Sequence, residues 1–198
     1  MTPALLPLPH MSIRQTAPRL LTVADLAAMP TSLPSGDVRY ELDNGVLVVM
    51  PPPGDIHSEK QSATTIILAT QAQAKGLGKV RVEVGIVLRR NPDRVVGADA
   101  AFLTNDQLPA MRTKEGYLET IPKLIVEVKS KNDFWPEIES KVAEYLAAGV
   151  ELVWVLDDDQ PTITAYTTGQ PQQVFAANDL LTAPFLPGFA VLVAEFFA

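Results

Sequence analysis

The chain has 198 residues, of which 47% are hydrophobic and 20% charged, values ordinary for a globular protein with one sizeable core. It has no cysteine and only two histidines, which excludes a disulfide framework and a thiol nucleophile and argues against a His-rich zinc site. The formal net charge of −7 argues against a nonspecific coat on nucleic acid, which needs a broad basic surface, but it leaves room for a small cationic or metal-filled cleft.

The N-terminal stretch, residues 1–20, is predicted to be a flexible tail. It is apolar but interrupted by Pro3, Pro7 and Pro9, and it lacks a basic n-region, so it makes a poor signal peptide. The sequence has no apolar run long enough to span a bilayer. We therefore expect a cytoplasmic protein without membrane association, in which residues 21–198 form a single domain.

The first elements after the tail are a short helix, a hairpin and a long helix. Thr22 is a suitable N-cap for the short helix, and Pro30 ends it. Residues 40–50 indicate two strands joined by Asn44-Gly45, a pair that fits a type I′ turn. Apolar residues at helical spacing then predict a helix over residues 56–75.

The remainder of the chain alternates strands with a second main helix. The predicted strands cover residues 80–88, 95–103, 124–130, 151–156 and 162–167, followed by short β segments near Val174 and a short final helix ending at Phe197. The second helix covers residues 134–148 and ends at Gly149. This order predicts an α/β fold: a mixed central β-sheet flanked by helices, with an N-terminal hairpin.

The predicted strand at residues 124–130 carries two charges in an otherwise apolar run. Glu127 and Lys129 are two residues apart, so their side chains leave the strand on the same face. Charges in a core strand are costly unless they are paired, bound to a metal or used in chemistry. The simpler alternative is a surface ion pair worth about 0–1 kcal/mol.

Asp99 interrupts a second apolar strand, although a strand-end residue capping a turn is the alternative for it. Two apolar strands, each with one acid, offer the hard oxygen ligands that Mg²⁺ or Mn²⁺ prefers. In this hypothesis Asp99 and Glu127 hold the metal with help from the Val128 carbonyl. Lys129 orients the attacking water and stabilises the developing negative charge.

These motifs belong to an ordered series that covers about residues 22–197. The segments are Tyr40–Met50, Pro53–His57, Gly97–Phe102, Leu124–Val128, Lys141–Tyr145, Ala148–Asp157 and Leu186–Phe189. Asp99 followed by Glu127-Val128-Lys129 resembles the motif of the PD-(D/E)xK nuclease superfamily, and the whole series is similar to the Uma2 (DUF820) family of restriction endonucleases. The family usually has Pro where this chain has Ala98, and it often lacks the lysine that stands here at position 129.

The resemblance implies a restriction-endonuclease-like core and a Mg²⁺- or Mn²⁺-dependent endonuclease that hydrolyses DNA phosphodiester bonds. It also implies that Glu41, on the first element, completes the metal shell; an ordinary hairpin residue is the alternative. Double-strand cutting by one site per chain would suggest a homodimer. The competing hypothesis is a catalytically silent scaffold on the same fold that binds nucleic acid or a protein partner, and the acidic net charge gives it some weight.

Two further residues are candidates for contacts with phosphate. His57 follows a Pro/Gly loop and could contact phosphate or relay a proton, or simply face solvent at the start of a helix. Lys141 could reach a phosphate from the second main helix, or be an ordinary solvated lysine. The run Asp157–Asp159 is better explained by turn-forming acids between two strands than by a metal site.

Overall fold

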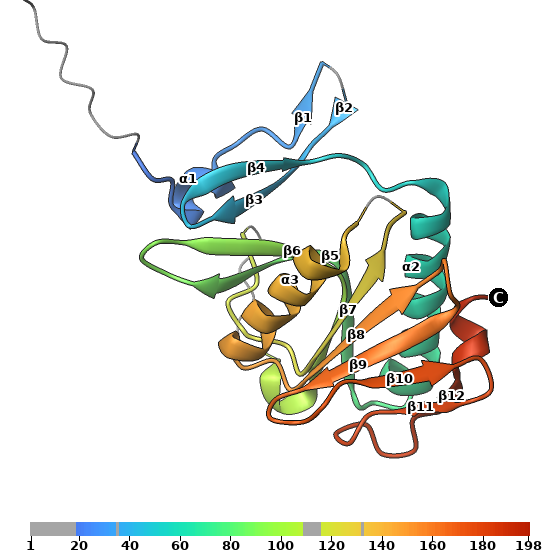
Figure 1. The fold of residues 1–198 in the computed structure, drawn as a ribbon. Helices are drawn as coiled ribbons and strands as arrows, with labels where there is room; N and C mark the ends of the chain where they lie inside the picture. Colours follow the sequence, from blue (N-terminus) through green and yellow to red (C-terminus); the bar gives the residue numbers. More distant parts are fainter. Residues whose placement is uncertain (1–18, 35, 109–115, 132) are drawn as a thin grey trace, which may run out of the picture.

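The computed structural model describes residues 19–34, 36–108, 116–131 and 133–198, and it has a mixed α/β fold around an eight-stranded sheet (Figure 1). The predicted tail lies almost wholly outside the described residues. Within them, no helix is long and apolar enough to cross a membrane. The architecture agrees with the predicted central mixed sheet flanked by few helices.

The N-terminal half contains the predicted hairpin and the first long helix. Its elements are α1 Val23–Ala27, β1 Ser32–Leu33, β2 Gly36–Asp37, β3 Arg39–Asp43, β4 Val46–Met50, α2 Asp55–Leu68 with a π-helical turn Ala69–Gln73, β5 Gly78–Arg89, β6 Arg94–Thr104 and a 3₁₀ turn Asn105–Gln107. Thr22 caps α1 as predicted, its side chain accepting a hydrogen bond from the Asp25 amide. Asn44 and Gly45 both have positive φ, at 52° and 78°, as a type I′ turn requires.

The C-terminal half supplies the second long helix and the remaining strands. Its elements are β7 Leu124–Lys129, α3 Trp135–Ala148, β8 Leu152–Asp157, β9 Thr162–Thr167, β10 Gln173–Ala176, β11 Leu180–Thr182, β12 Ala190–Leu192 and a 3₁₀ turn Val193–Phe196. Gly149 ends α3 in the left-handed conformation, with φ at 106°. At the end of the chain, where the sequence predicted a short helix, the structure has a single 3₁₀ turn, Val193–Phe196.

The large sheet has the strand order β10-β9-β8-β7-β6-β3-β4, with β5 paired to β6. Among the named strands that the structure describes in this sheet, β7 and β8 are the one parallel pair, and α3 makes the crossover between them. The pairing of β6 with β7 is short, from Phe102 opposite Leu124 to Ala100 opposite Val126. Asp99 and Glu127 are the next residues on each strand, so they lie where the two strands separate.

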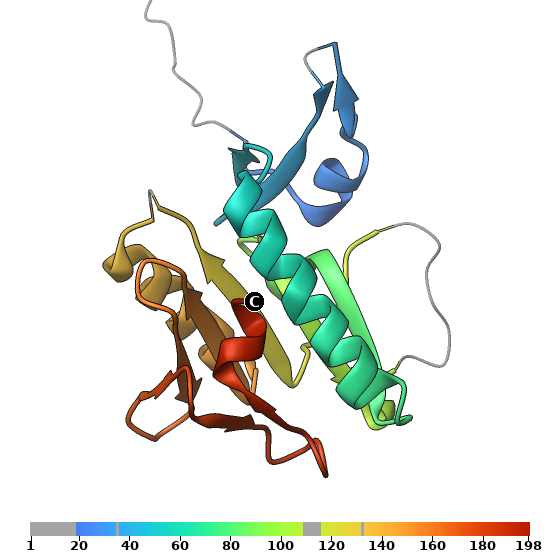
Figure 2. The ribbon, with the colours of Figure 1, turned by 90° about the vertical axis from the view of Figure 1, so that its right-hand side faces the viewer.

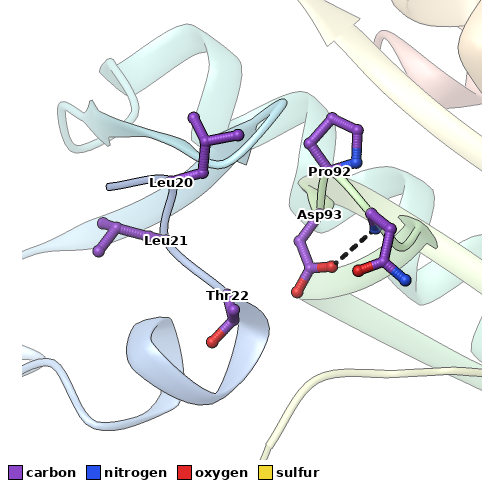
Figure 3. A pocket seen from close by; sticks show the side chains of 6 residues that line it. Leu20, Leu21, Thr22, Pro92 and Asp93 are labelled. Atoms are coloured by element: carbon purple, nitrogen blue, oxygen red, sulfur yellow. Dashed lines mark hydrogen bonds between the residues drawn. The ribbon is translucent and has the colours of Figure 1, made fainter. Parts of the chain in front are cut away.

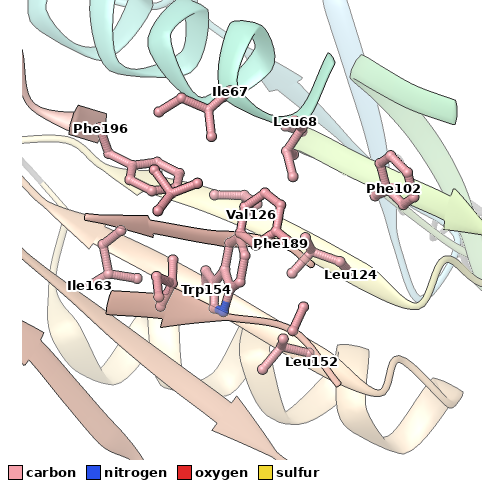
Figure 4. Packing of buried hydrophobic residues seen from close by; sticks show 14 of the residues in the cluster. Ile67, Leu68, Phe102, Leu124, Val126, Leu152, Trp154, Ile163, Phe189 and Phe196 are labelled. Carbon is pink, nitrogen blue, oxygen red and sulfur yellow. The ribbon is translucent and has the colours of Figure 1, made fainter. Parts of the chain in front are cut away.

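Helices cover both faces of the centre of the sheet. On one face, α2 and the C-terminal turn lie side by side (Figure 2), and Ile67 and Leu68 pack with aromatic residues of the sheet and terminus (Figure 4). The Trp154 ring is stacked with Phe189 at 5.8 Å between centroids and meets the edge of Phe196 at 6.2 Å. Burial on both faces explains why every residue of β8 is buried.

Candidate active site

Asp99 joins three elements through its carboxylate and backbone. Its Oδ2 accepts a hydrogen bond of 2.8 Å from the Val128 amide, across the gap where β6 and β7 separate. Its Oδ1 lies 3.0 Å from His57 Nε2, and its carbonyl accepts a hydrogen bond of 3.0 Å from Gln61 Nε2 of α2. Asp99 therefore fixes the position of α2 and β7 relative to β6.

His57 lies in the first turn of α2 between two polar partners. Because an ionised carboxylate only accepts hydrogen bonds, the Nε2 that faces Asp99 carries a proton. The other ring nitrogen, Nδ1, is 3.0 Å from Ser130 Oγ, just beyond β7. Burial lowers the pKa of His57, but the hydrogen bond and charge of Asp99 outweigh burial, so the pKa is raised above 6.5.

Glu127 is largely buried, with 13% of its side chain exposed, and both carboxylate oxygens have partners on α3. Oε2 lies 3.0 Å from Lys141 Nζ, and Oε1 accepts a hydrogen bond of 2.5 Å from the Tyr145 hydroxyl. Burial, with the charge of Asp99 adding to it, raises the pKa of Glu127 to about 7 against the opposing effect of Lys141 and Tyr145.

Lys141 places its ammonium group among three carboxylates. Besides Glu127, its Nζ donates to the Gly97 carbonyl at 3.0 Å and lies 3.9 Å from Glu41 Oε1. Burial lowers the pKa of Lys141, but the charges of Glu127, Glu41 and Asp99 outweigh burial and raise it. The lysine is therefore a fixed positive charge, held by the Gly97 carbonyl and by acids from β3 and β7.

Glu41 reaches this group from the hairpin. Its side chain is 9% exposed, and Oε1 accepts a hydrogen bond of 2.8 Å from the Gly97 amide. Arg94 lies 3.5 Å from the other oxygen and also forms a 2.5 Å ion pair with Glu144 of α3. Glu41 is thus a buried member of the cluster as well as an anchor of the hairpin.

The ion-pair partners of Lys129 are not Glu127, the neighbour on its own strand that the sequence suggested. Its Nζ lies 2.7 Å from Asp159 Oδ2 and 3.3 Å from Asp157 Oδ1, at the turn between β8 and β9. Lys129 lies opposite Asp157 in the parallel pairing of β7 with β8, so its flexible side chain extends sideways along the sheet. The ammonium group in contact with Glu127 is that of Lys141.

One family model matches most of the chain. The model of the Uma2 family, described as "Putative restriction endonuclease", matches residues 23–194. The chain belongs to the Uma2 family. A solved structure of a putative nuclease belonging to DUF820 from Anabaena variabilis ATCC 29413 has the same fold, with a TM-score of 0.74 and 17% sequence identity over 89% of this chain and 97% of that chain. No curated protein matches the chain.

The cluster of this Uma2 chain includes two residues that the sequence did not single out as site residues. In the sequence, Tyr145 stands out only as the end of the segment Lys141–Tyr145, and Ser130 only as the end of the predicted strand at residues 124–130. Lys141 and Tyr145 are four residues apart, which places both on one face of α3. A lysine and a tyrosine sharing the core-facing side of a helix would have been the available signal that they meet Glu127.

Asp99 and Glu127 fit a divalent cation in part. They are hard oxygen donors, and the charge of Asp99 contributes to the raised pKa of Glu127, a cost that a bound cation would relieve. Within the part of the Uma2 chain that the structure describes, no three His, Asp or Glu side chains form a metal-binding group. Two carboxylates suit an ion such as Mg²⁺, which keeps several waters.

Two cavities elsewhere on the Uma2 fold contain none of these residues. One of about 260 Å³ lies between the start of α1 and the β5–β6 turn and is lined in part by Leu20, Pro92 and Asp93 (Figure 3). Hydrogen bonds from the Val23 and Asn91 amides engage Asp93 and lower its pKa, so this carboxylate serves to dock α1. The other, of about 410 Å³, lies between the end of α3 and residues 184–185.

Proposed function

We propose that this protein is a metal-dependent endonuclease that hydrolyses DNA phosphodiester bonds at the cluster of Asp99, Glu127 and Lys141, with Glu41 as its fourth member. The observation that carries the proposal is the contact of 3.0 Å between Lys141 Nζ and Glu127 Oε2, in a cluster with two further acids. Membership of a family described as "Putative restriction endonuclease" supports the same reaction class.

Each residue of the cluster has a distinct part in this proposal. Asp99, Glu127 and the Val128 carbonyl are the candidate ligands of Mg²⁺ or Mn²⁺, and the ion would supply Lewis-acid activation of a bound water when present. Lys141 takes the part that the sequence assigned to Lys129: it orients the attacking water and stabilises the charge that develops on the phosphate.

The surrounding residues hold these groups in place. Tyr145 fixes Glu127, and His57 fixes Asp99, each through a hydrogen bond to one carboxylate oxygen. Glu41 holds the Lys141 ammonium on the side of the hairpin. A contact of His57 or Lys141 with a substrate phosphate remains part of the proposal, because each of the two bases contacts an acid of the cluster.

The decisive experiment compares the two lysines. Cleavage of plasmid and of single-stranded DNA is measured with Mg²⁺ and with Mn²⁺ for wild type, Asp99→Asn, Glu127→Gln, Lys141→Ala and Lys129→Ala. We expect a loss of at least about 100-fold for the first three variants, the scale of a lost electrostatic stabiliser. Lys129→Ala is the matched control and should retain the wild-type rate within a few-fold.

The competing hypothesis is a catalytically silent scaffold that binds nucleic acid or a protein partner. The specific observation in its favour is that both carboxylates already have hydrogen-bond donors within the chain. Absence of cleavage by wild type with either metal would support the scaffold. A rate for Lys141→Ala equal to wild type, with a loss for Lys129→Ala, would instead return the catalytic lysine to position 129.

Two other expectations remain proposals with direct measurements. Cutting both strands of a duplex by one site per chain would need a homodimer, which sedimentation of the purified protein can detect. The cytoplasmic location is likewise a prediction, to be tested by fractionation of cells.

A further inference from the structure

Two exposed apolar residues directly adjoin, in sequence, residues that are hydrogen-bonded at or next to the Asp99–His57–Ser130 contact. Phe134, the N-cap residue of α3, is 69% exposed, and Ile56, in the first turn of α2, is 56% exposed. Ile56 directly precedes His57. On the other side, Phe134 follows Asp133, whose carboxylate accepts a hydrogen bond of 2.7 Å from the Ser130 amide.

The two segments come from distant parts of the sequence but meet at one end of the molecule. The hydrogen bond between His57 and Ser130 ties the start of α2 to the loop after β7. Both segments lie at the upper end of the sheet in Figure 1, on the side of the β3–β4 hairpin. An exposed apolar residue alone is ordinary on a protein surface, but here each of two adjoins a segment that is hydrogen-bonded at the proposed catalytic group.

In the part of the chain that the structure describes, the cations around the cluster already have acidic partners. Ion pairs join Lys141 to Glu127, Arg94 to Glu144, Lys129 to Asp159 and Lys60 to Glu59. Proteins that bind a duplex by its backbone neutralise several phosphates with accessible Lys and Arg. Among the described residues of the loop after β7, Lys131 is exposed and can add one phosphate contact to the one proposed for His57 or Lys141, fewer than the several that a duplex footprint needs.

An aromatic ring beside a reactive site suits a ligand with accessible base faces. Bases in a duplex are stacked on one another, whereas an unpaired base can stack on an aromatic side chain. Such stacking needs little charge, which is compatible with the net charge of −7. We propose that Phe134 and Ile56 form a platform for an unpaired nucleotide beside the reactive phosphate, so that the substrate is single-stranded DNA. This inference rests on the proposed nuclease function of the site.

The test measures binding separately from cleavage. The full chain carrying Glu127→Gln, which blocks the proposed reaction, is titrated against a labelled strand of about 20 nucleotides and against the same strand annealed to its complement. We expect the single strand to bind about ten-fold more tightly than the duplex. Its affinity should fall only weakly with salt, by a logarithmic slope near −0.7 per phosphate contact, for one or two contacts.

Variants separate stacking from simple burial of apolar surface. In the same background, Phe134→Leu should weaken binding of the strand about ten-fold, and Phe134→Tyr should restore it, because only the aromatic residues offer a ring face. Ile56→Ala should weaken binding a few-fold. Ile66→Ala is the matched control, an isoleucine of the same helix with 61% exposure, and should leave binding unchanged.

The outcomes distinguish this inference from the proposed function. Equal or tighter binding of the duplex, no binding of either DNA, or a Phe134→Leu variant that binds like its parent would each overturn the platform. Cleavage by wild type that favours duplex DNA would overturn the platform but keep the nuclease. Strand binding that depends on Phe134, with no cleavage under any metal, would keep the platform and overturn the nuclease.

Discussion

The hydroxyl group of Tyr145 helps to position the Glu127 carboxylate in the cluster. The Tyr145 side chain is fully buried, and its hydroxyl donates to Glu127 Oε1 while Lys141 holds the other oxygen. Burial and the charges of Glu127, Glu41 and Asp99 raise the pKa of Tyr145 well above its usual value, so the tyrosine stays protonated and remains a donor. Tyr145 is therefore a positioning residue for the carboxylate.

Replacing Tyr145 by Phe removes this donor and leaves the ring in place. The hydrogen bond lowers the pKa of Glu127, so its loss should raise that pKa further above 7. Because the proposed reaction uses the ionised carboxylate, the acidic limb of the pH–rate profile should move to higher pH. We also expect the free energy of unfolding to fall by about 1–3 kcal/mol, measured in urea. An unchanged pH profile with reduced stability would restrict Tyr145 to a structural part.

The pKa of Glu127 also predicts a stability effect with a defined sign. The folded pKa of about 7 lies above the unfolded value of 4.5, so between these values the folded state binds the proton more tightly. The stabilisation of the folded state by the protonated Glu127 side chain is fully present below pH 4.5 and is lost as the pH rises through about 7. Its maximum is about 3 kcal/mol.

Glu127→Gln tests this sign because it removes the titration. Measured in EDTA, the unfolding free energy of the variant relative to wild type should increase as the pH rises from 4.5 to 8. Other groups, including His57 with its raised pKa, titrate in the same range, so the quantity to compare is the difference between the two proteins. A difference that is constant with pH would show that the carboxyl does not titrate there.

The sequence identifies residues that interrupt apolar strands, but it does not identify their neighbours in the fold. The conspicuous acids of two apolar strands, Asp99 and Glu127, lie where β6 and β7 separate. The strand period correctly gives Glu127 and Lys129 a common face, but it cannot say that β8 brings Asp157 opposite Lys129. The strand period also cannot show that α3 brings Lys141 into contact with Glu127. Both facts depend on which elements become neighbours.

At the scale of elements, β5 and β6 approach so closely that a glycine is required at one point. A Cβ atom built on Gly78 would lie 2.1 Å from the Leu103 carbonyl oxygen and 2.7 Å from the Phe102 ring. The carbonyl belongs to the paired backbone, which cannot move without disturbing the long ladder between the two strands. The pairing with β5 fixes the position of β6 and therefore of Asp99, which is a residue of β6.

We therefore expect Gly78→Ala to destabilise the fold by about 1–3 kcal/mol through overpacking, measured as the midpoint and slope of urea unfolding. Gly54→Ala is the control: Gly54 has negative φ and no heavy atom within 4 Å of an added Cβ. It should change stability by less than about 1 kcal/mol, the scale of an N-cap change. Equal effects of the two substitutions would contradict the close approach.

The elements that sequence predicted well are those with strong local signals. The hairpin, both long helices and the strands from β5 to β10 were expected from turn residues and from period-2 or helical patterning. The pairs β1–β2 and β11–β12 were missed because they are two or three residues long. A strand of two or three residues is too short to show the period-2 pattern of polar and apolar residues. It is recognised only through its pairing with the partner strand.

The excess of acidic over basic residues in the whole molecule suggests that a bound cation should stabilise the fold. Glu41, Asp99 and Glu127 lie around one ammonium group, and the chain as a whole carries a net charge of −7. An ion that binds only the folded state raises the unfolding free energy by about 1.4 kcal/mol at ten times its dissociation constant. For a chain of this size that corresponds to a rise in Tm of about 3–5 °C.

The measurement is thermal unfolding of the full chain in Mg²⁺ and in Mn²⁺, with KCl at matched ionic strength as the control. The control is necessary because any salt screens the self-repulsion of an acidic protein and can raise its Tm without a site. We expect the divalent ions to exceed KCl for wild type and for Lys129→Ala, since Lys129 lies outside the cluster. Asp99→Asn should respond to the divalent ions as it does to KCl. A rise that Asp99→Asn retains in full would place the stabilising ion elsewhere on the surface and remove Asp99 from its ligands.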